Sequence, residues 1–240
     1  EHSKLAAEWF DNKLSQTIET IDEHFSKFRL SDALMTLYKF FWDDFCAWYL
    51  EVIKPEYGKP IDKVTYDTTI VFFEKLLRLL HPIMPFITEE LWQNIEERKD
   101  GETIMLQPQP KAAPYSVETI HAFEQGVGAI ASVRNIRQSK GLSPKEALTL
   151  QIKGAFPEKI VSVVKRMANL SEVSLVSEID NSVNGAAFMV DTIEFFVPLT
   201  GMVNAEEEIA KMEAEIAHLT KFRKGGEAML SKERIVQNAT

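Results

Sequence analysis

The sequence predicts a mainly α-helical protein in three parts: a helix bundle over residues 1–141, a small α/β unit over 142–201, and a C-terminal coiled-coil helix with a hinge over 202–240. Three observations predict this order. Apolar residues recur every three or four positions through most of the first 140 residues, which is the period of one helix face. Short segments then alternate with period two, as half-buried strands do. The last part repeats apolar residues at helical spacing among Glu, Lys and Ala, which is typical of a coiled-coil strand.

The first two helices of the bundle should have broad apolar faces. The first face comprises Leu14, Ile18, Ile21, Phe25 and Phe28. The second follows Ser31, a predicted N-cap, and comprises Ala33, Leu34, Leu37, Phe41, Phe45, Trp48 and Tyr49. Aromatic stripes at this spacing usually belong to a core, and we predict that these do.

The next helices are marked by caps and prolines. A third helix should run from Asp62 to Leu80 and end at Pro82 and Pro85, because proline lacks an amide donor and restricts the residue before it. Thr88 is then the predicted N-cap of a short helix, which contains an acidic pair suited to the positive helix start.

A proline-rich stretch over 101–114 predicts a connector. Residues 116–140 should again be helical, and Gly141 and Pro144 should end that helix.

The α/β unit should hold one helix over residues 157–168. Its predicted strands cover residues 147–152, 173–176, 187–190 and 193–197. In the third part, the coiled-coil stripe comprises Ile209, Met212, Ile216, Leu219 and Phe222. The Gly225-Gly226 pair lacks the pattern of a phosphate-binding loop, so it predicts a helix interruption.

Charge is distributed unevenly. The chain has 27 Lys and Arg against 36 Asp and Glu, a net charge of −9, which argues against a nucleic-acid interaction driven by the whole molecule. Residues 130–170 contain eight basic and two acidic residues, or +6, which leaves −15 for the rest of the chain. That zone could bind a polyanion, or it could be an ordinary lysine-rich surface.

Several functional classes have no support in the sequence. The single Cys46 predicts no internal disulfide and a cytosolic location, and the apolar stretch 33–53 has too many charges to predict a membrane span. No signal peptide is visible at the first residues. The five histidines lack metal-ligand spacing, so no metal site is expected. The adjacent pairs Asp43-Asp44 and Glu89-Glu90 should be solvated, since neighbours on a helix diverge and cannot form a catalytic dyad.

Two motifs resemble a known family. They are Phe40-Phe41-Trp42-Asp43-Asp44-Phe45-Cys46-Ala47-Trp48-Tyr49-Leu50-Glu51 and Leu79-Leu80-His81-Pro82-Ile83-Met84-Pro85-Phe86-Ile87-Thr88-Glu89-Glu90-Leu91-Trp92-Gln93. Both closely resemble the anticodon-binding domain of the valyl-tRNA synthetases, a branch of the class I aminoacyl-tRNA synthetases. The segment 133–137 is similar to the family's Arg-x-x-Arg helix. Residues 199–219 resemble the start of its coiled-coil arm, and 230–239 resemble the hinge of that arm.

The resemblance implies a C-terminal fragment. The first helix of the anticodon-binding bundle would lie before Glu1, and the arm would be truncated at Thr240. The fragment is then expected to hold tRNA(Val) without catalytic residues, metal or cofactor of its own. The intact enzyme, expected to be a monomer, would attach valine to tRNA(Val) with ATP and magnesium, using catalytic and editing domains that this chain does not contain.

Six basic residues are candidates for contact with tRNA. Arg134, Arg137 and Lys140 recur every three positions, so they can line one helix flank, as contact with phosphates requires. Lys221, Arg223 and Lys224 would place positive charge on the arm. Each arginine could instead form an ion pair with a neighbouring acidic helix.

A second hypothesis is a helical protein–protein interaction module without RNA binding. The net charge of −9 favours it, and so do the apolar side chains of an unpaired coiled-coil helix, which would also make the fragment self-associate. Salt-sensitive binding of tRNA separates the two hypotheses, because phosphate contacts release counterions and an apolar interface does not.

Overall fold

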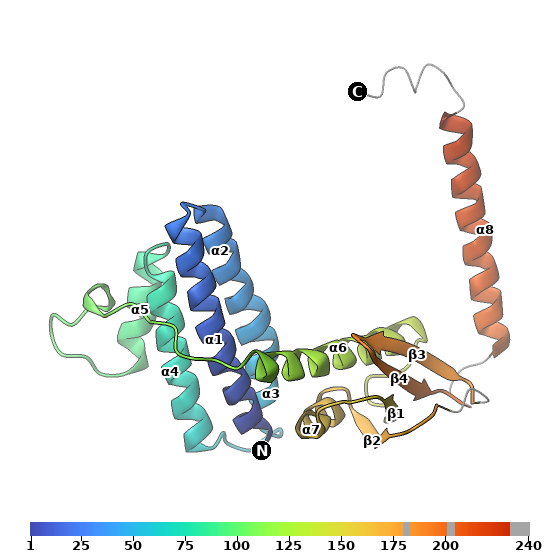
Figure 1. Ribbon diagram of the computed structural model, residues 1–240, viewed down its shortest axis with the longest axis horizontal. Coiled ribbons are helices and arrows are strands. Elements are labelled where there is room, and N and C mark those ends of the chain that lie inside the picture. The colour runs from blue at the N-terminus through green and yellow to red at the C-terminus, as the bar shows by residue number, and fades with distance from the viewer. Residues whose placement is uncertain (180–182, 201–204, 231–240) are drawn as a thin grey trace.

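A computed structural model describes residues 1–179, 183–200 and 205–230 of the chain. Figure 1 shows a group of long helices, a small sheet with helices beside it, and one further helix drawn apart from both. This arrangement confirms the mainly α-helical fold with a small α/β unit and a C-terminal helix.

The helices of the bundle follow the predicted order. They are α1 (His2–Ser26), α2 (Leu30–Lys39), α3 (Leu50–Ile53), α4 (Lys63–Leu80), α5 (Pro85–Ile95) and α6 (Val117–Ser139). A wider π-helical segment, η1 (Phe40–Tyr49), joins α2 to α3, and a short 3-10 turn, η2 (Ile104–Leu106), lies in the connector. Asp62 caps α4 by accepting a hydrogen bond from the Thr65 amide at 2.9 Å, and Ser116 caps α6 in the same way.

Two predicted helix starts are wrong. Helix α2 begins at Leu30, so Ser31 lies inside it. Helix α5 begins at Pro85, because the fixed φ and missing amide of proline suit the first position of a helix. Thr88 is therefore buried within α5, where its hydroxyl donates to the Met84 carbonyl at 2.8 Å.

The predicted interruption of the C-terminal helix is also wrong. Helix α8 (Ala205–Leu230) continues through Gly225 and Gly226. A glycine inside an exposed helix costs only about 1 kcal/mol relative to alanine, so its presence does not by itself end a helix.

Phe10 of α1 lies at the centre of the bundle core. Its ring centroid is 4.9 to 5.4 Å from those of Phe40, Phe45, Tyr49 and Phe72. The aromatic core is thus confirmed at the buried Phe45 and Tyr49. The prediction that Phe25, Phe28 and Leu34 belong to the core is wrong, because their side chains are exposed.

The sheet contains four strands in the order β2-β1-β4-β3. They are β1 (Leu148–Lys153), β2 (Leu170–Leu175), β3 (Gly185–Val190) and β4 (Ile193–Pro198). Strands β1 and β2 are parallel and are joined by α7 (Glu158–Met167), whereas β4 runs antiparallel to both of its neighbours. The predicted strands and helix of the α/β unit are confirmed.

Helix α6 joins the bundle to the sheet (Figure 1). It contacts α1, α7 and β3. The approach is close at Gly126, where an added Cβ would lie 2.5 Å from a methyl carbon of Ile160 on α7. One cluster of buried apolar residues extends from α1 to β4, so the core is continuous across residue 141. The boundaries at 141 and 201 stay predictions.

Candidate nucleic-acid interface

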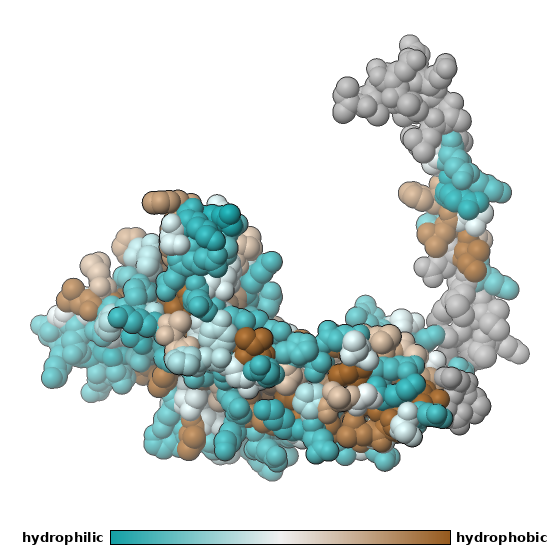
Figure 2. All heavy atoms as spheres, viewed as in Figure 1, coloured by the Kyte–Doolittle hydropathy of each residue, from teal (hydrophilic) through white to brown (hydrophobic). Residues whose placement is uncertain are grey.

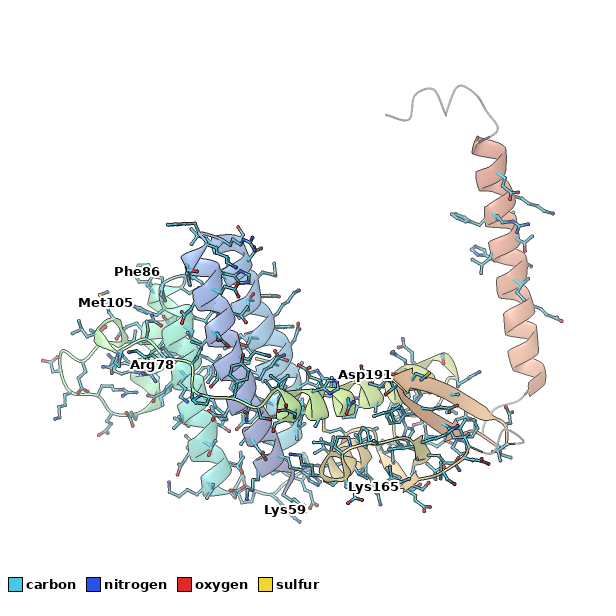
Figure 3. The ribbon with its side chains drawn as sticks, in the orientation of Figure 1. Lys59, Arg78, Phe86, Met105, Lys165 and Asp191 are labelled. Carbon is cyan, nitrogen blue, oxygen red and sulfur yellow. The ribbon has the colours of Figure 1, made fainter. Side chains whose placement is uncertain are left out.

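The α1–α2 and α4–α5 turns form one end of the bundle, and both expose apolar side chains. Phe28 between α1 and α2 is 91% exposed, and Phe86 in the first turn of α5 is 89% exposed. Leu30 and Ile87 beside them are exposed too. In Figure 2, apolar side chains interrupt the polar surface at this end. Figure 3 places Phe86 and Lys59 at opposite ends of the bundle.

A groove of about 230 Å³ lies between the two turns. Helices α1 and α2 supply Ile21, Asp22, Phe25, Ala33 and Leu37, and the α4–α5 region with the connector supplies Leu79, Pro82, Ile83, Gln109 and Pro110. The lining is mainly apolar, with one carboxylate and one carboxamide. Such a groove can take a flat ring and offer hydrogen bonds to its edge.

Phe28 is held in an unfavourable backbone conformation. Its φ of 56° lies in the left-handed region, which bulky side chains rarely adopt. It follows the last turn of α1, where the amide of Phe28 donates to the Phe25 carbonyl at 3.0 Å and that of Arg29 donates to the His24 carbonyl at 2.9 Å. Glycine is the usual residue at this position of such a helix end. The chain therefore places a large exposed ring where glycine would be easier to accommodate.

Cations flank the exposed ring. Lys27 and Arg29 lie on either side of Phe28 and are exposed, with Lys27 paired to Glu23. Neither the two exposed rings nor these cations are among the six basic residues predicted to contact tRNA. The available signal was Lys27-Phe28-Arg29, a basic and aromatic triplet between two helical patterns.

The His-Pro motif builds the α4–α5 turn. The Nδ1 of His81 lies 2.8 Å from the hydroxyl of Thr88. Glu89 accepts hydrogen bonds from the Thr103 hydroxyl at 2.6 Å and the Ile104 amide at 3.1 Å, which anchors the connector. Burial opposes the ionisation of Glu89, but these bonds and one from Gln93 outweigh it and lower the pKa of the carboxyl. Glu89 is thus a half-buried structural anchor, which differs from the fully solvated side chain that was expected, whereas Glu90 is exposed.

Asp44 also differs from expectation. The side chain was expected to be solvated, but burial raises its pKa to about 6, against the attraction of Lys13. Lys13 itself pairs with Glu124 at 2.6 Å. No hydrogen bond from another group offsets the burial of Asp44 in the described contacts, so its ionised form is disfavoured in the fold.

Arg137 does not line an exposed flank. Its side chain is buried, with 7% of the residue exposed. The guanidinium donates to the carbonyls of Ser143, Glu146, Ala168 and Asn169 at 2.5 to 3.2 Å. The spacing of three residues did not predict this, because α6 turns Arg137 toward α7 and away from solvent. The alternative, an ion pair with a neighbouring acidic helix, is not what the hydrogen bonds of Arg137 show either, because the acceptors of its guanidinium are backbone carbonyls.

The other five candidates differ in their surroundings. Arg134 is exposed, donates to the Met167 carbonyl at 3.1 Å, and lies 5.6 Å from the ring centroid of Trp48. Lys140 is half-buried at the end of α6. Lys221, Arg223 and Lys224 are exposed on α8, where Arg223 lies 3.5 Å from Glu227. Their contact with tRNA stays a prediction.

The structure describes only part of the predicted coiled-coil stripe on α8. Ile216, Leu219 and Phe222 are exposed. The side chains of Ile209 and Met212 and the predicted hinge beyond Leu230 lie outside the described residues. Pairing of α8 as a coiled coil therefore stays a prediction.

Within the described residues, no group of three or more His, Cys, Asp or Glu side chains could hold a metal ion. Among the helices of the same residues, none is long and apolar enough to cross a membrane.

The helix bundle and the start of the α/β unit match the anticodon-binding domain of tRNA ligases. The family model for the anticodon-binding domain of tRNA ligase matches residues 7–152, more than half of the chain, and the chain belongs to this family. Its relatives narrow the class. The chain is 45% identical over 239 residues to the valine–tRNA ligase of Parabacteroides distasonis and 46% identical over 237 residues to that of Bacteroides fragilis.

A more distant relative is the valine–tRNA ligase of Enterococcus faecalis, at 34% identity over 252 residues. These alignments cover 98 to 100% of the chain, but only 27 to 28% of the three ligases. They confirm the resemblance to the valyl branch. The chain thus spans about a quarter of the length of the relatives that it matches.

Proposed function

We propose that this chain is the tRNA-holding part of a cytosolic valine–tRNA ligase, and that its bundle end binds unpaired nucleotides of tRNA(Val). The complete ligase would attach valine to that tRNA with ATP and magnesium. The chain itself would contribute binding energy and position, while activation of valine would take place elsewhere in the complete protein.

The conformation of Phe28 is the observation that best supports this proposal. A left-handed φ at a bulky residue costs of the order of 1 kcal/mol, and exposure of the ring contributes no packing in return. Stacking of a base on an aromatic side chain contributes about 1–3 kcal/mol. Proteins recognise RNA loops mainly through bases that are splayed out and stacked in this way. An unpaired base therefore explains both unusual properties of Phe28.

The neighbouring groups fit the same ligand. Arg29 can contact a phosphate on one side of a stacked base, and Lys27 can do so on the other side in exchange for its ion pair with Glu23. In the groove, Asp22 offers an acceptor to a base edge, and Gln109, whose Nε2 donates to the Arg78 carbonyl at 3.2 Å, offers its carboxamide oxygen. A surface with two exposed rings and two flanking cations is thus complementary to single-stranded RNA.

The test is the affinity of the purified chain for labelled tRNA(Val), measured by fluorescence anisotropy. Phe28→Ala and Phe86→Ala should each weaken binding about tenfold, because each removes one stacking surface. Tyr57→Ala is the matched control: Tyr57 is a fully exposed aromatic residue in the loop between α3 and α4, at the opposite end of the bundle. An unrelated tRNA measures specificity. If Phe28→Ala and Phe86→Ala bind tRNA(Val) as tightly as Tyr57→Ala, the proposal is wrong.

A protein-binding role is the second candidate, and one observation favours it. Leu34, Tyr38 and Trp42 recur every four residues along α2 and η1, and all three are exposed. The exposed stripe of α8 offers a second apolar surface through which the chain could self-associate. A protein interface would show little dependence on salt, whereas RNA binding should weaken between about 50 and 200 mM salt. Light scattering at high concentration tests self-association.

A further inference from the structure

The guanidinium of Arg137 ties together two turns of the α/β unit. Ser143 and Glu146 lie between α6 and β1, while Ala168 and Asn169 lie between α7 and β2. The carbonyls of the first pair accept at 3.2 and 2.5 Å, and those of the second pair both accept at 2.9 Å. One side chain of α6 thus contacts the segments that lead into both parallel strands.

Asn169 reinforces this connection. Its φ of 50° turns the chain sharply after α7, and its Nδ2 donates to the Pro144 carbonyl at 2.9 Å. The two turns are therefore joined to each other as well as to Arg137. Together they form a single unit at the C-terminal end of α6.

The chemistry of these contacts requires arginine. The last carbonyls of a helix lack partners within the helix and lie at its negative end, so a cation is favourable beside the end of α7. A guanidinium presents five N–H groups in one plane and can serve several carbonyls at once. An ammonium group has three N–H groups on one nitrogen and cannot reach the same set.

Two further arginines make contacts of the same kind across the junction. Arg134 of α6 donates to the Met167 carbonyl at the end of α7. Arg166 of α7 donates to the carbonyls of Val52 and Lys54 at the end of α3. Both side chains are exposed, so these contacts are weaker than those of the buried Arg137.

We propose that Arg137 is a positioning residue that fixes the orientation of the α/β unit relative to the bundle. Helix α6 contacts both α1 and α7. At the C-terminal end of α6, the four carbonyl contacts of Arg137 hold the segments that lead into the sheet. The orientation of the sheet then sets the spacing between the bundle end and the basic side chains of the α/β unit, among them Lys145, Lys159 and Lys165. In this role, Arg137 influences RNA binding without contacting a phosphate.

Spin-label distance measurements test the orientation directly. One label replaces Val71, exposed on α4, and the other replaces Met189, exposed on β3, in a Cys46→Ser background. The unsubstituted Arg137 should give one narrow distance distribution. Arg137→Gln should broaden it at least twofold, and Arg137→Lys should broaden it less. Arg134→Gln, on the same helix and with one carbonyl contact, is the matched control and should leave the width unchanged.

Circular dichroism shows which variants keep their secondary structure. If Arg137→Gln does not fold, Arg137→Lys provides the comparison with Arg134→Gln. A folded Arg137 variant whose distance distribution equals that of the control would overturn the proposal. Equal broadening by Arg134→Gln would overturn it as well, because the effect would then not belong to the buried guanidinium.

The consequence for RNA rests on the proposed function. Arg137→Gln should weaken binding of whole tRNA(Val) about tenfold but leave the affinity for its isolated anticodon hairpin unchanged, since the hairpin reaches only the bundle end. A general folding defect would weaken both equally and would count against positioning. If the unsubstituted chain binds neither RNA, the proposed function fails, and the distance measurement still decides the role of Arg137.

Discussion

The bundle end and the α6–α7 junction differ in which side chains they expose to solvent. At the bundle end, Phe28 and Phe86 are almost fully exposed, although apolar rings usually belong to a core. At the junction, Arg137 is buried, and its guanidinium is occupied by four backbone carbonyls. The residue type alone would suggest a core in the first region and an RNA contact in the second. The difference teaches that the availability of a side chain marks a binding surface better than its charge does.

The largest expected effect follows from removing the buried guanidinium. Arg137→Ala removes the guanidinium from four carbonyls, of which Ser143 keeps the Glu146 amide at 3.1 Å and Glu146 keeps Asn169 Nδ2 at 3.5 Å. A hydrogen bond to a charged group contributes about 1.5–3 kcal/mol, and each contributes less when several share one side chain. The free energy of unfolding should fall by about 3–4 kcal/mol in urea titrations.

Arg134→Ala is the matched comparison, because it removes an exposed arginine from the same helix. It should lower the free energy of unfolding by less than about 1 kcal/mol. Equal losses in the two variants would contradict the contrast between a buried guanidinium with four carbonyl partners and an exposed one with a single carbonyl partner.

A half-buried carboxylate of η1, Asp44, sharpens the contrast. Because burial raises the pKa of Asp44 from 3.8 to about 6, the fold favours its protonated form. Its contribution to stability is present below pH 4 and is lost as the pH rises through 6. Asp44→Asn keeps a neutral side chain at every pH. The variant should therefore be more stable than the unsubstituted chain by up to about 3 kcal/mol at pH 8, and by less than about 1 kcal/mol at pH 4.

Urea unfolding at pH 4, 6 and 8 measures this difference. Asp43→Asn is the control, since Asp43 is adjacent and exposed. The control should change the free energy of unfolding by no more than about 0.5 kcal/mol at any of these pH values. A gain for Asp44→Asn that does not grow between pH 4 and pH 8 would show that the carboxylate is not disfavoured in the fold.

Much of the architecture could be predicted from local patterns. Helix and strand periods depend on neighbours within a few residues, so the bundle helices, including the one that begins near Asp62, and the α/β unit were predicted correctly. The predicted caps at Ser31 and Thr88 were wrong because both helices begin earlier in the chain. Helix α2 begins at Leu30, and α5 begins at Pro85. The π-helical widening of η1 had no recognisable signal in the sequence.

The candidate site was harder to predict for a physical reason. Whether Arg137 faces solvent depends on how α6 packs against α7, and that packing involves residues about 30 positions away. The exposure of Phe28 depends on where α1 ends relative to the bundle, which periodicity locates only to within a few residues. The family motifs identified the relatives, but the His-Pro motif builds the α4–α5 turn and did not point to the exposed rings.

The smallest effect provides the sharpest test of the bundle end, because two properties should change in opposite directions. Phe28→Gly removes the left-handed strain and an exposed ring, so the free energy of unfolding should rise by about 0.5–1 kcal/mol. The same substitution should weaken binding of tRNA(Val) about tenfold, because the stacking surface is lost. Phe86→Ala should weaken binding similarly without the gain in stability, since no left-handed φ is found at Phe86. If Phe28→Gly is less stable than the unsubstituted chain, the ring packs against the protein, and its conformation no longer argues for an RNA contact.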